Sequence, residues 1–171
     1  MTEPARTTRL RPSLLDRLTD LHPERRLETT DEITVDEAGL REQVRRDLTW
    51  LFNTTHVEAG MDLNPYPHVK SSILNFGMTD LTGQQLSSIK ADALAKSVRQ
   101  ALLTYEPRLL PSSIGIAVQL GKNPFGTAAL IVEIEADLFS EPLPIALHLR
   151  TEIDVETGRV TVGDAASKKG K

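Results

Sequence analysis

The stretch Ile89–Pro111 constrains the fold most, because it joins a clear helix pattern to a proline stop and then to a series of strands. Apolar residues recur along its first part at steps of three to five, which is typical of a helix with one buried face. They are Ile89, Leu94, Val98, Ala101, Leu102 and Tyr105. Pro107 biases the preceding Glu106 away from helical backbone angles. The pattern therefore predicts a helix that ends at a fixed corner, Glu106-Pro107-Arg108.

Four segments after this corner have the short, alternating pattern of β-strands. They are residues 114–120, 128–138, 145–154 and 159–162. In the second strand, Leu130, Val132, Ile134 and Ala136 share one face, and Glu133 and Glu135 share the other. Short connections favour antiparallel pairing. We expect the third or fourth strand to be an open edge that accepts a partner strand.

A second strong helix is predicted to begin at Thr34 or Asp36. Its apolar stripe consists of Leu40, Val44, Leu48, Leu51 and Phe52. We place Arg41, Glu42, Arg45, Arg46 and Asp47 on the opposite, solvated face, and expect Trp50 to be a partly buried anchor.

Helices first and strands last indicate an α+β fold, with N-terminal helices packed on a small, mainly antiparallel, four-stranded sheet. The predicted organisation is an N-terminal tail with a short helix and a linker (residues 1–33), a single α+β domain (34–163) and a flexible tail (164–171). The intervening segment 53–83 is rich in loops, with a turn at Asp80–Gly83 and possible helix caps at Thr82 or Ser87.

The short N-terminal helix, beginning at Ser13, has leucines on one face: Leu14, Leu15, Leu18 and Leu21. Such a stripe packs on its own domain in most proteins. A helix of about two turns is marginal by itself, however, so docking on a partner protein is the alternative.

Composition excludes several classes of protein. The net charge of −4 does not indicate a nucleic-acid-binding protein, which normally has clustered basic residues. The absence of cysteine excludes disulfides, thiolate metal sites and a cysteine nucleophile. No secretion signal or membrane-length apolar run is present, which predicts a soluble cytoplasmic protein without direct membrane insertion.

No established catalytic motif or phosphate-binding loop occurs in the sequence. His56 and His68 lack metal-ligand spacing, so we expect no catalytic, cofactor or metal site. Glu106 and Arg108 have two interpretations. The first, favoured by the residues alone, is an internal brace in which Arg108 binds helix-end carbonyls and Glu106 binds a nearby amide or cation. The second is a rigid charged fork presented to another protein.

Four motifs that follow one another along the chain bear on the choice between these two interpretations. They are SLLDRL, RRDLTWLFNT, SSILNFGMTDLTG and TYEPRL. Together they resemble the TssE family of type VI secretion baseplate proteins, related to the tail-wedge proteins of contractile phages. The resemblance covers about Ser13 to Val162. Where the family reads Asn-Tyr-Gly and then a proline-containing turn, this chain has Asn75-Phe76-Gly77 and Met78-Thr79-Asp80.

The resemblance implies a structural role in a cytoplasmic baseplate docked near the inner membrane. The implied partners are the wedge proteins TssF, TssG and TssK and the sheath proteins TssB and TssC, whose polymerisation such proteins help to start. It also implies that Glu106, Pro107 and Arg108 contact the baseplate. Two alternatives remain open: a lysozyme-like peptidoglycan hydrolase, suggested by a label that the family carries, and an unrelated soluble adaptor.

Overall fold

The computed structural model describes residues 10, 12–20, 23–25, 34–85, 89–122, 128–141 and 143–165. The chain divides into two compact units, Met1–Arg46 and Asp47–Lys171. Several predicted features lie wholly or partly outside the described residues: Leu21, the linker within residues 1–33, Ser87, the connection between the first two predicted strands and the C-terminal tail.

The first unit contains a short helix, α1 (Leu14–Leu18), and the beginning of α2 (Glu37–Phe52). Ser13 caps α1, since its hydroxyl accepts a hydrogen bond from the Asp16 amide. Of the two predicted starts of α2, Asp36 is the one that caps it: its Oδ1 accepts from the Gly39 amide at 2.8 Å. The predicted apolar stripe of α2 is buried along its whole length.

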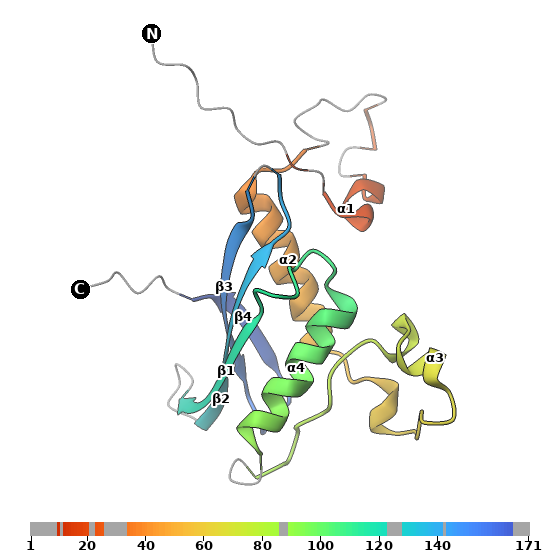
Figure 1. The fold of residues 1–171 in the computed structure, drawn as a ribbon, viewed down its shortest axis with the longest axis vertical. Coiled ribbons are helices and arrows are strands. Elements are labelled where there is room, and N and C mark those ends of the chain that lie inside the picture. The colour runs from red at the N-terminus through yellow and green to blue at the C-terminus, as the bar shows by residue number, and fades with distance from the viewer. Residues whose placement is uncertain are drawn as a thin grey trace, which may run out of the picture. The chain divides into compact units, whose positions relative to one another are not determined.

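The second unit is built on a four-stranded antiparallel sheet, which confirms the α+β prediction. The strands are β1 (Gly115–Lys122), β2 (Ala128–Leu138), β3 (Ile145–Ile153) and β4 (Val160–Asp164), in that order across the sheet (Figure 1). The edges are therefore β1 and β4. Of the two strands expected to include the open edge, β4 is an edge, whereas β3 pairs on both sides.

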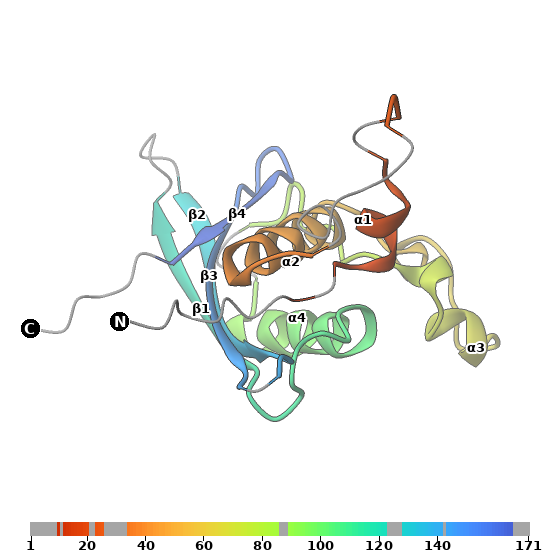
Figure 2. The same cartoon turned by 90° about the horizontal axis from the view of Figure 1, so that it is seen from above.

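Helices cover one face of this sheet. The buried residues of α4 (Ala91–Tyr105) are Leu94, Val98, Ala101 and Leu102, as the sequence pattern predicted. Figure 2 shows α4 and the end of α2 on the same side of the strands. The predicted inward row of β2 is buried, whereas Glu135 on the other face is exposed and Glu133 is half-buried. Lys90, and not Thr82, precedes the first residue of α4, and its side chain makes no capping bond.

The loop-rich segment between α2 and α4 contains three single-turn elements: η1 (Val57–Ala59), α3 (Pro67–Lys70) and η2 (Ile73–Asn75). The predicted turn is present, because Asp80 Oδ1 accepts from the Thr82 amide and Gly83 has a φ of 74°. Among the described residues, no helix combines the length and apolarity needed to cross a membrane.

Candidate functional site

The predicted corner forms where α4 ends. Glu106 is the C-cap, with φ −121° and ψ 78°, so the backbone leaves the helical conformation immediately before Pro107. The segment that follows is bonded to β2: the Leu110 amide donates to Asp137 O at 2.8 Å, and the Phe139 amide donates to Arg108 O at 2.7 Å. The corner is thus held at both ends by backbone hydrogen bonds.

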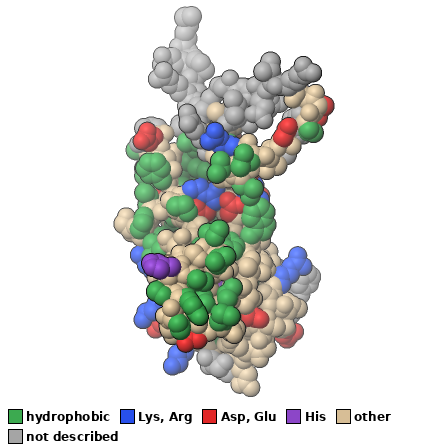
Figure 3. Space-filling model, turned by 90° about the vertical axis from the view of Figure 1, so that its right-hand side faces the viewer, with side chains coloured by type: hydrophobic (Ala, Val, Ile, Leu, Met, Phe, Trp, Pro, Cys, Tyr) green, Lys and Arg blue, Asp and Glu red, His purple; other side chains and the backbone are tan. Residues whose placement is uncertain are grey.

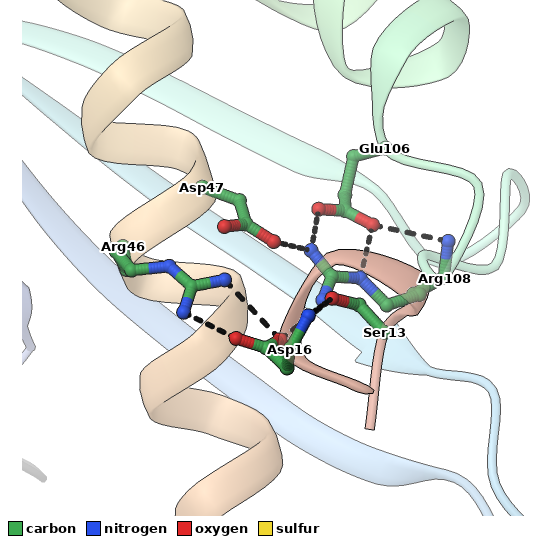
Figure 4. Close-up of polar contacts among 6 residues, drawn as sticks. All are labelled: Ser13, Asp16, Arg46, Asp47, Glu106 and Arg108. Atoms are coloured by element: carbon green, nitrogen blue, oxygen red, sulfur yellow. Dashed lines mark hydrogen bonds and ion pairs between the residues drawn. The ribbon is translucent and has the colours of Figure 1, made fainter. Parts of the chain in front are cut away.

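This non-helical backbone lets two side chains that are only two positions apart form a bidentate pair (Figure 4). Arg108 Nε donates to Glu106 Oε1 at 2.6 Å, and Arg108 Nη2 donates to Glu106 Oε2. The Arg108 amide also donates to Glu106 Oε1, at 3.2 Å. The Glu106 side chain is only 4% exposed, so its negative charge is balanced by Arg108 and not by solvent.

Arg108 also reaches α2. Its Nη2 donates to Asp47 Oδ2 at 2.6 Å, and both side chains are about one-quarter exposed. The prediction that Asp47 lies on a solvated face is therefore wrong. Nothing local in the sequence indicates this contact, since Asp47 and Arg108 are far apart in the chain and become neighbours only when α2 and the corner pack. The three residues Asp47, Glu106 and Arg108 form what we call the corner cluster.

The corner cluster keeps Arg108 charged. Burial by itself lowers the pKa of the guanidinium, but the hydrogen bonds and negative charges of Glu106 and then Asp47 outweigh it, so the pKa is raised. Arg108 Nη1 is buried and has no hydrogen-bond partner among the described residues. The guanidinium therefore retains unused donors.

The internal brace has a different form from the one expected. The bonds shown for Arg108 go to carboxylates, and it is Arg99 that binds carbonyls, donating to Ile114 O at 2.6 Å and to Pro111 O at 3.2 Å. Pro107 is exposed. The corner thus combines an internally satisfied ion pair with an outward-facing proline.

A second motif lies against the corner. The Tyr105 hydroxyl donates to Asn75 O at 2.6 Å, and the Tyr105 ring meets Phe76 edge-on with centroids 5.3 Å apart. Asn75 is buried; its side chain accepts from the Glu58 amide and donates to Lys70 O. The Asn75-Phe76-Gly77 loop and the residue before Glu106 are therefore one packed structure, which the sequence analysis did not foresee.

Gly77 fixes the path of that loop. Its φ is 128°, and a Cβ there would lie 2.3 Å from Thr54 O. The close approach lets Met78 pair with residues after α2, since its amide donates to Thr54 O at 2.8 Å. A glycine is required here for both conformation and space.

Within the first unit, all three leucines of α1 are exposed, and α1 has no buried residue. Its position is set by charge instead: Arg46 donates to both carboxylate oxygens of Asp16, at 2.5 and 3.2 Å (Figure 4). The apolar face of α1 is available to a partner, which the docking interpretation requires. That interpretation remains a prediction.

Exposed apolar side chains also gather on the segment between α2 and α4. They are Val57, Met61, Tyr66, Ile73 and Leu74. We call these five residues the apolar lobe. Figure 3, which faces the side of the molecule where α3 lies, shows hydrophobic side chains at the surface there. Such a grouping is typical of a protein contact surface.

The reactive side chains named in the sequence analysis do not converge. Glu133 and Glu135 lie on the face of the sheet away from the helices, and His56 Nε2 lies 3.0 Å from Thr79 Oγ1. No group of three potential metal ligands occurs among the described residues. The acids that do come together, Asp47 and Glu106, are both ion-paired with Arg108.

A family model described as baseplate wedge protein gp25 matches residues 38–143. No curated protein and no solved structure matches. The matched region includes α2 apart from its first residue, the Asn75-Phe76-Gly77 loop and the whole corner cluster.

Proposed function

The chain belongs to the family of the baseplate wedge protein gp25, and from that premise we propose that it is the TssE subunit of a bacterial type VI secretion baseplate. In this role it bridges wedge subunits and starts assembly of the contractile sheath. The family match over residues 38–143 carries the proposal. A structural role in a phage-tail-like baseplate is what the family itself supports.

The surface of the protein supports a role in assembly. The leucines of α1 and the apolar lobe expose large apolar side chains, which bury area when a partner covers them. The edge strands β1 and β4 offer backbone donors and acceptors to an added strand. We assign the α1 leucines and Pro107 to contacts with the wedge proteins TssF, TssG and TssK, and an edge strand to the sheath proteins TssB and TssC.

The proposed role is structural and not enzymatic, in a baseplate on the cytoplasmic side of the inner membrane. The corner cluster supports it, because an arginine shared by two carboxylates fixes the geometry of a surface. A glycosidase instead needs one carboxyl group whose pKa is raised and a second acid opposite it. Asp47 and Glu106 are instead both ion-paired with the same arginine, Arg108, and do not face each other across an open cleft as two catalytic acids would.

The experiment is reconstitution of the wedge from purified TssF, TssG, TssK and this protein. Leu18→Ser tests the α1 face, because Leu18 is 74% exposed and its replacement removes little internal packing. We expect at least tenfold weaker co-purification with an unchanged melting temperature. Leu143→Ser is the matched control, since Leu143 is 73% exposed and lies between β2 and β3.

The proposal also predicts the outcome for the wild-type protein. Wild type should co-purify with the wedge subunits and leave purified cell walls intact in a turbidity assay. Failure to co-purify, or clearing of cell walls that a single glutamate substitution abolishes, would contradict it. Equal retention of the wild-type and Leu18→Ser proteins would remove α1 from the interface.

A further inference from the structure

A pocket lies inside the Asp47–Lys171 unit, away from the corner cluster. Its volume is about 60 Å³. Phe52 at the end of α2, Leu94 and Val98 of α4 and the inward faces of β2 and β3 line it. A space of this size takes a few water molecules or the buried end of one side chain.

Thr151 is the unusual residue in this pocket. It lies on the inward face of β3, between Val132 of β2 and Val162 of β4 in the sheet register. The residue is 1% exposed, and its Oγ1 has no hydrogen-bond partner among the described residues. A buried hydroxyl without a partner is destabilising.

The protein's own packing gives no reason for this hydroxyl. Valine has nearly the shape of threonine, and valine occupies the positions on both sides of Thr151 in the register. The hydroxyl becomes favourable only when a hydrogen-bonding atom enters the pocket. Thr151 is therefore a polar point without an internal partner on the inward side of the pocket, where Leu94, Val98 and Val132 are apolar, and such a point can fix the orientation of a ligand.

The residues that line the pocket determine which kind of side chain can bind in it. The apolar side chains beside Thr151 disfavour a charged group, which would lose its hydration there, and Asp80 Oδ1 already accepts hydrogen bonds from the amide and the hydroxyl of Thr82. An aliphatic side chain fits the walls but leaves Thr151 unpaired. A phenol group satisfies both conditions, because its ring is apolar and its hydroxyl both donates and accepts. The polar residues Thr55, Thr79 and Asp80, which also line the pocket, suit the backbone of a polypeptide that presents this group.

We propose that this pocket binds the phenol side chain of a tyrosine supplied by another subunit of the baseplate, with its hydroxyl bonded to Thr151. The assignment of the tyrosine to another baseplate subunit rests on the proposed function. The preference of the pocket for a phenol group does not depend on that function.

The first experiment tests that chemistry on the purified full-length chain. p-Cresol, the side chain of tyrosine, and toluene, which lacks only the hydroxyl, are titrated while the NMR signals of Leu94, Val98 and Val132 are followed. We expect saturable p-cresol binding that is about 2- to 10-fold tighter than toluene binding. In Thr151→Val, which keeps the shape of the wall, the two ligands should bind equally.

Two results would overturn the proposal: no saturable shift of these signals with p-cresol, or the same preference for p-cresol in Thr151→Val as in wild type. A thermal melt of Thr151→Val verifies that the variant is folded, which we expect because valine already occupies the adjoining positions.

The second experiment tests the source of the phenol group. Saturating p-cresol should weaken co-purification of the reconstituted wedge, and toluene at the same concentration should weaken it less because it occupies less of the pocket. Tight p-cresol binding with no effect on assembly would overturn the assignment to a partner tyrosine. If wild type fails to assemble at all, the proposed function fails, whereas the p-cresol titration still decides whether the pocket has the stated chemistry.

Discussion

Arg108 Nη2 lies 2.6 Å from Asp47 Oδ2, which joins the corner after α4 to the last turns of α2 across 61 positions of sequence. The same guanidinium forms a fork with Glu106. Arg108 thus forms an internal brace, and its role as a partner contact remains a prediction. The surface left for a partner at this corner is Pro107, because the unpaired Nη1 of Arg108 is buried.

Arg108→Ala should lower the free energy of unfolding by about 2–3 kcal/mol, because it leaves two partly buried carboxylates without a counter-charge. Arg108→Lys should recover less than half of that loss, since an ammonium cannot form the bidentate fork. Urea denaturation measures both. The control is Arg150→Ala, whose pair with Glu152 is more exposed and should contribute less than about 0.5 kcal/mol. An Arg108→Ala protein as stable as wild type would show that the cluster contributes nothing to stability.

Gly77→Ala should lower the free energy of unfolding by at least about 2 kcal/mol, because the new Cβ combines an unfavourable φ with a clash against the Thr54 carbonyl. Gly60→Ala is the matched control from the same segment. Gly60 has a helical backbone conformation and no atom within 4 Å of its would-be Cβ, so the change should lie within about 0.5 kcal/mol of wild type. Chemical denaturation of the pair tests this, and equal stability of the two variants would contradict it.

Tyr105→Phe should cost about 1 kcal/mol through loss of the hydrogen bond to Asn75 O. The loss should be local as well as global, so backbone amides of residues 73–76 should exchange faster with deuterium. Tyr66→Phe, at an exposed tyrosine of the apolar lobe, should change neither quantity. Unaltered exchange at residues 73–76 in Tyr105→Phe would mean that packing of the ring, and not its hydroxyl, holds the loop.

Stability should fall at high pH partly because of Tyr105. Burial, assisted by the negative charge of Glu58, raises the pKa of Tyr105 above its usual value of 10.0. As the pH rises, the Tyr105 hydroxyl therefore loses its proton in the unfolded chain before it does so in the folded protein. The contribution of Tyr105 to stability is complete below about pH 10 and declines as the pH rises above it. The difference in unfolding free energy between wild type and Tyr105→Phe should therefore shrink between about pH 9 and pH 11. A difference that grows over this interval would contradict the assigned shift.

Local pattern accounts for the parts of the fold that were predicted. The 3.6-residue periodicity of α2 and α4 identified their buried faces, and the alternation in β2 identified the row from Leu130 to Ala136. Pro107 was sufficient to place the corner. Each of these signals depends on residues only a few positions apart.

The features that were missed depend on contacts between distant residues. Asp47 is an ordinary polar position on a helix until the corner brings Arg108 beside it. Arg99 is likewise a surface residue by periodicity, yet it reaches the carbonyls of the segment before β1. No pattern in the sequence distinguishes Thr151 from any other strand threonine.

The sequence by itself determined the order of helices and strands, their inward faces, the corner at Pro107 and the family, because these reside in spacing and local backbone preference. The tertiary structure decided which charges meet, which strands are edges, and which hydroxyl is buried without a partner. The physical reason is that the free energy of an ion pair or a buried hydroxyl depends on the atoms around it in space, and packing brings those atoms from distant positions in the chain.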